Sequence, residues 1–196
     1  MTHTALPVLH TVVLAAGASR RFGSPKQLVR RDGVTLLESA TARALAVGAG
    51  PVTVVLGCGA SSLTPLLRHS PATVRINCDW EEGMASSLRL IAHEVDGRCD
   101  GLLVTLVDQP AVTVHDLQRL HQTWLAQPQS IIAAAYSATV GVPAIFPAAC
   151  LGELRALRGE AGARAVLQRH LASVHRVPMP AAALDVDVPQ DLQRLP

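Results

Sequence analysis

The sequence predicts an α/β fold in three layers, α/β/α, with a mostly parallel β-sheet between two layers of helices. Short apolar runs of strand length alternate with longer amphipathic segments along the 196 residues, and this alternation is typical of parallel sheets with helical crossovers. Apolar residues make up 49% of the chain and charged residues 16%, which suits a buried core rather than disorder. No repeat or linker divides the chain, so we expect one Rossmann-like domain over residues 1–196.

Each predicted strand is a short apolar run. The first, residues 8–15, is interrupted only by His10 and Thr11 and is too short for a helix of typical length. The other runs predict strands at residues 52–56, 73–76, 102–107, 131–135, 142–146 and 173–177. Amphipathic segments of helix length predict helices at residues 35–47, 61–68, 84–95, 113–126, 148–157 and 163–170. In such a fold, ligands bind beyond the carboxyl ends of the strands.

The composition excludes several classes of protein. A net charge of +2 and only 3% aromatic residues argue against a nucleic-acid partner, which would need a basic surface or stacking rings. No apolar run reaches the ~18 residues of a membrane span, and the start shows no secretory leader pattern, so we expect a cytoplasmic protein with no membrane partner. The four cysteines show no zinc-ligand spacing, and we expect free thiols at Cys58, Cys78, Cys99 and Cys150.

The loop after the first predicted strand has the features of a polyphosphate site. Gly17 and Gly23 allow the backbone to approach a ligand closely or to adopt φ > 0. The same loop carries three cations, Arg20, Arg21 and Lys26. Exposed N–H groups and fixed cations at the carboxyl end of a buried strand favour phosphate binding. The spacing fits neither a Walker A loop nor the dinucleotide fingerprint, and the alternative is a solvated basic loop at a sheet edge.

The apolar run at residues 102–107 ends abruptly in Asp108. A carboxylate at the end of a buried strand is costly unless it has a cation, a capping role or water. Thr113 is the better N-cap for the following helix, so we expect Asp108 to bind a divalent cation such as Mg²⁺. Asp185 and Asp187 lie two apart in an extended segment, point to one face and need a cation or water between them.

Two further segments offer weaker signals. Gly57 stands in a Gly-x-Gly sequence after a predicted strand, where it either contacts a ligand or merely forms a tight turn. The segment 77–88 places an acidic turn and Gly83 before a helix that begins near Met84. The first turn of that helix offers free N–H groups and the hydroxyls of Ser86 and Ser87 to an anion, although a single serine there is commonly only an N-cap.

Together these motifs resemble the MobA-like nucleotidyltransferases, position for position. The first motif of that family matches at Leu14, Ala15, Ala16, Gly17, Ser19, Arg21, Gly23 and Lys26. The continuation Lys26-Gln27-Leu28, and Asn77, Gly83, Met84 and Ser87, resemble the MocA-like branch, the molybdenum cofactor cytidylyltransferases. Further matches lie at residues 108–110, 141–146, 159–164 and 185–192, with departures at Val142, Glu160 and Val188.

The resemblance implies a nucleotide-diphospho-sugar-transferase-like fold and transfer of CMP from CTP to the phosphate of molybdopterin, with release of pyrophosphate. Ala16 favours CTP, because guanylyl members tend to have Gly at this position. Lys26, Arg21 and Asp108 would be catalytic, and Asp108 and Asp187 would bind Mg²⁺. A molybdoenzyme is a further expected partner. Nucleotide contacts would come from Leu14, Ala15, Ala16, Gly17, Ser19, Gly23, Gly57 and Ser87.

Two alternatives remain open from the sequence. One is a nucleotidyltransferase with another phosphorylated acceptor, such as a sugar phosphate, a polyol phosphate or phospholactate. The other is a redox enzyme or a cofactor-delivery protein that binds a nucleotide on this fold without transferring it.

Overall fold

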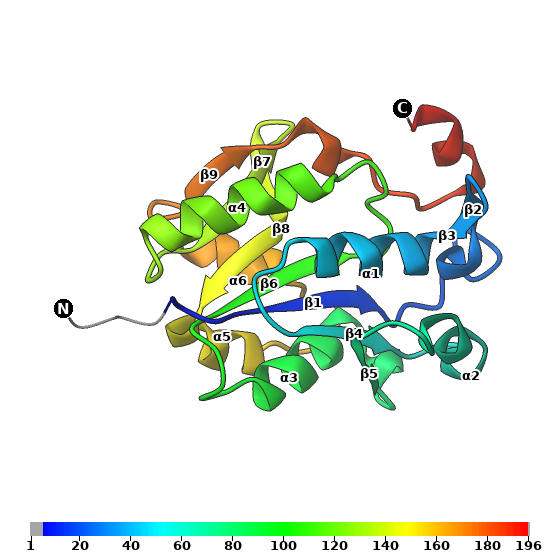
Figure 1. Ribbon diagram of the computed structural model, residues 1–196, viewed down its shortest axis with the longest axis horizontal. Helices are drawn as coiled ribbons and strands as arrows, with labels where there is room; N and C mark the ends of the chain where they lie inside the picture. The colour runs from blue at the N-terminus through cyan, green and yellow to red at the C-terminus, as the bar shows by residue number, and fades with distance from the viewer. Residues whose placement is uncertain (1–5, 196) are drawn as a thin grey trace.

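The computed structural model describes residues 6–195, so residues 1–5 and residue 196 of the predicted domain lie outside the description. Its centre is a seven-stranded sheet with the strand order β5-β4-β1-β6-β8-β7-β9. The sheet strands are β1 (Leu9–Ala15), β4 (Val52–Leu56), β5 (Thr73–Ile76), β6 (Gly101–Leu106), β7 (Ile132–Tyr136), β8 (Thr139–Pro147) and β9 (His175–Pro178). The mostly parallel sheet predicted from the sequence is confirmed, and β1 is an interior strand between β4 and β6 (Figure 1).

Strand β8 is the exception to the parallel arrangement. It pairs antiparallel with β6 on one side and with β7 on the other, whereas β1, β4, β5 and β6 pair in parallel. The cause is a two-residue turn between β7 and β8, in which Ser137 and Ala138 both adopt positive φ angles of 47° and 58°. Two such residues match the right-handed twist of a hairpin, so β7 and β8 form one instead of being joined by a crossover.

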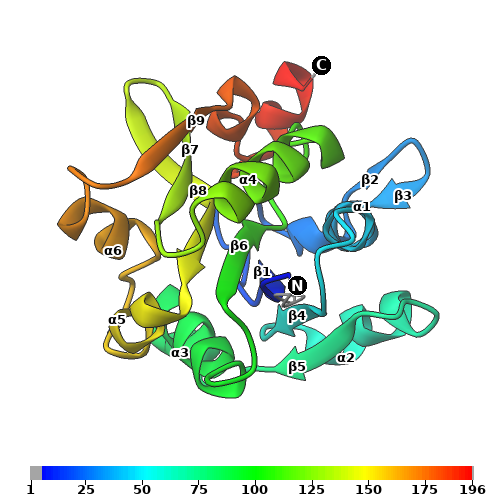
Figure 2. The same ribbon diagram turned by 60° about the vertical axis from the view of Figure 1, so that its left-hand side comes forward.

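Helices cover both faces of the sheet. Helices α1 (Leu36–Ala46) and α4 (Val114–Ala126) lie on one face, while α3 (Met84–Glu94), α5 (Leu151–Arg155) and α6 (Arg164–Arg169) lie on the other (Figure 2). Successive side chains of β1 point to opposite faces of the sheet, so this strand contributes to the core on both sides. Val12 packs toward α3 and Val13 toward α1. The short α2 (Ala60–Leu63) packs with α1 through Leu63.

Threonine N-caps fix the starts of two long helices, α1 and α4. Thr113 is confirmed as the N-cap of α4, and its hydroxyl accepts a hydrogen bond from the Asp116 N–H at 3.2 Å. Thr35 caps α1 in the same way with Glu38. The predicted helix 61–68 is instead α2 followed by the 3₁₀ helix η2 (Thr64–Leu67). Pro65 has no N–H to continue an α-helical ladder.

The sequence prediction missed a small hairpin and several short helices. β2 (Arg30–Arg31) and β3 (Val34–Thr35) pair antiparallel around Asp32-Gly33, a dipeptide that favours tight turns. The predicted helix 148–157 divides into η4 (Ala148–Cys150) and α5. The remaining 3₁₀ helices are η1 (Lys26–Leu28), η3 (Trp80–Glu82), η5 (Pro180–Ala183) and η6 (Pro189–Arg194). Within residues 6–195, no helix has both the length and the apolar character needed to cross a membrane.

Candidate active site

A cavity of about 290 Å³ opens at the carboxyl edge of the sheet. The loop after β1, the end of β6 and the start of α3 form its walls. Eight of the predicted site residues line it: Leu14, Ala15, Ala16, Gly17, Ser19, Lys26, Ser87 and Asp108. Its other lining residues include Gln27, Trp80, Met84 and Glu160, for which the sequence analysis assigned no role. The position agrees with the rule that ligands bind beyond the carboxyl ends of parallel strands.

The loop after β1 is shaped by hydrogen bonds to its own side chains. Gly23 adopts the expected positive φ of 82°, but Gly17 does not, and Ser19 takes the left-handed conformation instead, with a φ of 54°. The Ser19 hydroxyl accepts a hydrogen bond from the Lys26 N–H at 3.1 Å. In the described part of the chain, the N–H groups of Gly17, Ala18 and Ser19 have no protein acceptor. They are therefore available to an anion in the cavity.

Gln27 holds this loop in place from beneath. Its side chain is 1% exposed, and its amide group donates to the carbonyls of Ala15 and Gly17, each at 2.9 Å. Its side-chain carbonyl accepts from the Ser19 hydroxyl at 3.3 Å. Gln27 of the matched sequence thus has a structural role that resemblance alone did not reveal.

We expect Gln27→Ala to lower the free energy of unfolding by about 1–3 kcal/mol, because it leaves buried carbonyls without a donor. The melting temperature should fall by about 2–4 °C for each kcal/mol in a chain of this size. Thermal denaturation of the purified protein measures this loss. Gln118→Ala on the exposed face of α4 is the matched control and should leave the melting temperature unchanged; equal melting of the two variants would remove the structural role assigned to Gln27.

Lys26 lies among carboxylates contributed by distant segments. Its ammonium is 2.5 Å from the Asp108 Oδ2 and 3.4 Å from the Asp187 Oδ1, and it donates to the Val186 carbonyl at 3.3 Å. Arg21 contacts the other oxygen of Asp187 at 2.9 Å. The structure therefore brings together four of the residues predicted as catalytic or metal-binding, although Arg21 and Asp187 do not line the cavity itself.

The residues around Asp108 fit a divalent cation. The Asp108 Oδ1 is buried and has no hydrogen-bond partner among the described residues. Partial desolvation, followed by the Asp108 carboxylate, raises the pKa of Asp185 to about 6. Three carboxylates, Asp108, Asp185 and Asp187, thus gather around the cations Lys26 and Arg21. A hard cation that prefers oxygen ligands matches this donor set, and the unpartnered oxygen is free to bind it.

The start of α3 forms the opposite wall. As predicted, an acidic turn, η3, and Gly83 precede a helix that begins at Met84. The amide of Asn77 donates to the hydroxyls of Ser86 at 2.7 Å and Ser87 at 3.0 Å. Ser86 donates onward to the Gly83 carbonyl at 2.8 Å, so only Ser87 of the two serines lines the cavity.

The turn at residues 159–164 docks against this wall. Gly83 has a φ of 116°, and a Cβ at this position would lie 2.6 Å from the Gly159 carbonyl oxygen. The Glu82 carboxylate accepts from the Gly159 N–H at 3.0 Å and pairs with Arg89, and the Arg89 hydrogen bond is the main cause of a Glu82 pKa of about 2. Glu160 thereby reaches the cavity. Arg164 instead donates to the Thr139 hydroxyl at 3.2 Å.

Gly57 lies behind the cavity wall rather than on it. A Cβ at this position would be 2.6 Å from the Trp80 Cβ and 2.7 Å from the Ala16 carbonyl oxygen, and Gly57 does not line the cavity. The absence of a side chain therefore lets Ala16 and Trp80 pack closely. Close packing therefore explains the glycine at this position, and the ligand contact predicted for Gly57 stays a prediction.

Residues 11–174 match the MobA-like NTP transferase domain family. The chain belongs to this family. Its sheet and helices have the nucleotide-diphospho-sugar-transferase fold that the sequence predicted, and solved nucleotidyltransferases share it. The chain thus carries a nucleotidyltransferase domain on a MobA-like fold.

Three proteins similar to this MobA-like chain come from different bacteria. Nicotine blue oxidoreductase of Paenarthrobacter nicotinovorans is 34% identical over 178 residues, covering 86% of each chain. A probable molybdenum cofactor guanylyltransferase of Rhodopirellula baltica is 28% identical, covering 98% of this chain and 93% of the relative. The solved structure of Rv0371c of Mycobacterium tuberculosis H37Rv in complex with manganese is 29% identical, covers 96% of this chain and 97% of its own, and has a TM-score of 0.78.

Proposed function

We propose that this chain transfers CMP from CTP to the phosphate of a molybdopterin-type acceptor and releases pyrophosphate. One observation carries the proposal: Lys26, with Asp108 and Asp187 around its ammonium, lies beside a glycine-containing loop with free N–H groups at the carboxyl edge of the sheet. The relative named as a molybdenum cofactor guanylyltransferase supports the acceptor class. The MocA-like motif at residues 77–88 supports the cytidylyl branch. We further propose that residues 1–196 act as one cytoplasmic domain and that a molybdoenzyme receives the product.

The triphosphate would bind in the loop after β1. The N–H groups of Gly17, Ala18 and Ser19 would donate to its phosphate oxygens, with Gly23 allowing the turn that follows. Lys26 and Arg21 would leave their carboxylate partners to neutralise the β- and γ-phosphates. Asp108 and Asp187 would hold Mg²⁺, which supplies charge stabilisation at the α-phosphate when bound. The manganese complex of the mycobacterial relative supports a divalent cation here.

The acceptor phosphate needs no general base in this reaction. A phosphomonoester has a second pKa of ~6 and is largely ionised at neutral pH. What these residues supply is the in-line orientation of two anions that would otherwise repel one another. The wall of Ser87, Met84 and Glu160 faces the loop across the cavity and would orient the incoming nucleotide and acceptor.

Ala16 is proposed to select the base. It is buried beside Gly57, and the Ala16 Cβ would be 2.9 Å from a Cβ placed on Gly57. Ala16 also lines the cavity together with Trp80, and its methyl group would occupy space that a glycine leaves open, which would favour the smaller pyrimidine of CTP over a purine. Leu14 and Ala15 complete the same side of the cavity.

Pyrophosphate release tests donor and acceptor together. The purified protein is incubated with Mg²⁺ and CTP, GTP or ATP, with and without molybdopterin that carries molybdenum. The proposal expects release with CTP only when that acceptor is present. Release with GTP would correct the base, and release only with a sugar, polyol or lactate phosphate would correct the acceptor. No release with any combination would contradict nucleotidyl transfer.

A redox function is the second candidate, favoured by one specific observation. The relative with 34% identity is named an oxidoreductase, so the same fold could bind a nicotinamide cofactor without nucleotidyl transfer. Thermal stabilisation discriminates, because a ligand at 100 times its dissociation constant adds ~2.7 kcal/mol of stability. Stabilisation by CTP with Mg²⁺ supports the transferase, whereas stabilisation by NAD(P)H alone supports the redox enzyme.

A further inference from the structure

A second group of metal-ligand side chains lies at the edge of the sheet opposite the cavity. Cys150, Glu153 and His170 each place one ligand atom within 4.8 Å of the other two. The sheet register locates this group: Pro147 at the end of β8 pairs with Gly101 at the start of β6. The cavity, in contrast, is lined by residues at the end of β6. The group is therefore separate from the candidate active site.

Three short helices, η4, α5 and α6, supply the three side chains. Cys150 ends η4, Glu153 lies one turn later in α5, and His170 is the C-cap of α6. Helices α5 and α6 cover the same face of the sheet (Figure 2). Glu153 follows Cys150 by 3 residues, but His170 is 20 residues from Cys150 and joins the group only through the fold. Sequence spacing alone therefore does not reveal the group.

The contacts within the group hold the ligands in position. The His170 Nε2 is 2.5 Å from the Glu153 Oε1, so a single proton bridges two potential ligands. The Arg169 Nε donates to the other oxygen, Glu153 Oε2, at 2.8 Å. Such an outer partner orients a carboxylate and leaves one oxygen for a metal. The Cys150 sulfur lies at the buried base of the group, with the residue 7% exposed.

We propose that Cys150, Glu153 and His170 bind a zinc-type transition-metal ion that ties α5 to the end of α6. A thiolate, an imidazole and a carboxylate form a donor set that favours Zn²⁺ or Co²⁺ over Mg²⁺, which prefers oxygen ligands alone. Zinc bond lengths of about 2.0–2.3 Å separate tetrahedral ligand atoms by about 3.3–3.7 Å, so the sulfur moves inward and the imidazole moves away from the carboxylate. The thiol proton leaves to solvent, and the proton between His170 Nε2 and Glu153 Oε1 leaves Nε2, either to solvent or by a change of tautomer to Nδ1.

The proposed ion has one open coordination position. Three protein ligands complete three corners of a tetrahedron, and the fourth faces the partly exposed side, where the Glu153 and His170 side chains are 33% and 35% exposed. Water would fill that corner. The Arg169 charge stays compensated by the Glu153 Oε2 it already contacts.

Cobalt titration of the metal-free full chain tests the proposal, with excess Mg²⁺ present to saturate oxygen-only sites. We expect one Co²⁺ per chain, a thiolate-to-cobalt charge-transfer band and displacement of the band by Zn²⁺. Cys150→Ser should abolish the band. Cys99→Ser is the matched control, since Cys99 is 9% exposed and lies in the same core but outside the group; it should keep the band.

His170→Gln provides a second variant should Cys150→Ser fail to fold, because His170 is partly exposed. It should weaken Co²⁺ binding by more than about 100-fold, beyond the 10–100-fold that loss of an outer partner costs. No band in the natural chain, a band that survives in Cys150→Ser, or unchanged affinity in His170→Gln would each overturn the proposal. The readout is absorbance of the bound metal, so its failure is independent of any result for nucleotidyl transfer.

Discussion

Asp108→Asn is expected to lower the rate of nucleotidyl transfer by about 10²–10³-fold, the usual loss when a charge-stabilising group is removed from a reaction centre. The substitution keeps the shape of the side chain but removes the charge that would hold Mg²⁺. The Asp108 Oδ1 has no hydrogen-bond partner among residues 6–195, whereas its Oδ2 contacts the Lys26 ammonium. The loss should therefore fall on turnover, and increasing Mg²⁺ should recover only part of it.

Steady-state pyrophosphate release at several Mg²⁺ concentrations measures this effect. Asp96→Asn is the control, because Asp96 forms an exposed ion pair with Arg155 away from the cavity, and its activity should match that of the natural chain. A cooperative melt near the natural temperature shows that Asp108→Asn has folded. Near-natural turnover in that folded variant would exclude Asp108 as a metal ligand.

Lys26→Met is expected to raise the KM for the triphosphate and to lower kcat, each by about 10–100-fold. The reason is that the Lys26 charge would stabilise the triphosphate both when it is bound and in the transition state. Methionine keeps most of the length of the side chain, so the loop keeps its packing. The change leaves Arg21 as the remaining cation with a contact to Asp187. The folded protein should then bind Mg²⁺ at least as tightly, because no ammonium competes for Asp108.

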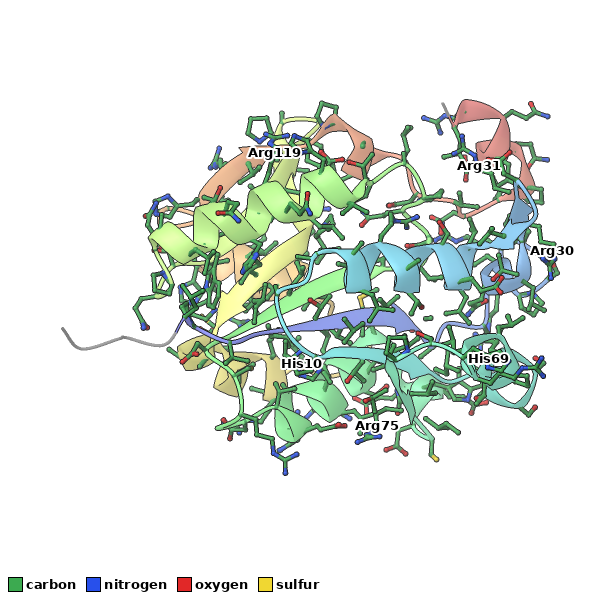
Figure 3. All side chains as sticks on the ribbon, in the orientation of Figure 1. His10, Arg30, Arg31, His69, Arg75 and Arg119 are labelled. Atoms are coloured by element: carbon green, nitrogen blue, oxygen red, sulfur yellow. The ribbon has the colours of Figure 1, made fainter. Side chains whose placement is uncertain are left out.

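Initial rates over a range of CTP concentrations separate the two effects. Arg30→Met is the matched control: Arg30 belongs to the β2–β3 hairpin at the same end of the molecule (Figure 3) but does not line the cavity. It should leave both constants unchanged. If Lys26→Met and Arg30→Met behave alike, the loop after β1 is a solvated basic loop and not a phosphate site.

The positions of Lys26 and Asp108 could be predicted from the sequence because the topology alone brings them together. Each follows a buried parallel strand, and the carboxyl ends of neighbouring strands share one edge of a sheet. β1 and β6 are such neighbours. Asp187 arrives from an extended segment near the end of the chain, and only the resemblance to the family suggested its role.

The opposite wall of the cavity could not be predicted in the same way. Glu160 reaches the cavity because its turn docks on Gly83, and that contact depends on tertiary packing rather than on periodicity. Gly57 does not line the cavity, and close packing with Trp80 accounts for a glycine at this position. The antiparallel β8 was missed because Ser137 and Ala138 carry none of the Gly or Asn signals of a tight hairpin turn.

Lys26 is the single lysine of this sequence, and its surroundings give the chain an internal reporter. Its side chain is 13% exposed and its ammonium contacts Asp108 and Asp187, so in the folded protein it is a poor nucleophile toward acylating reagents. Apart from the amino terminus, no other primary amine competes for such a reagent. Mass spectrometry after brief acylation would therefore follow, at one atom, the moment when a cation displaces the ammonium and the amine becomes free to react.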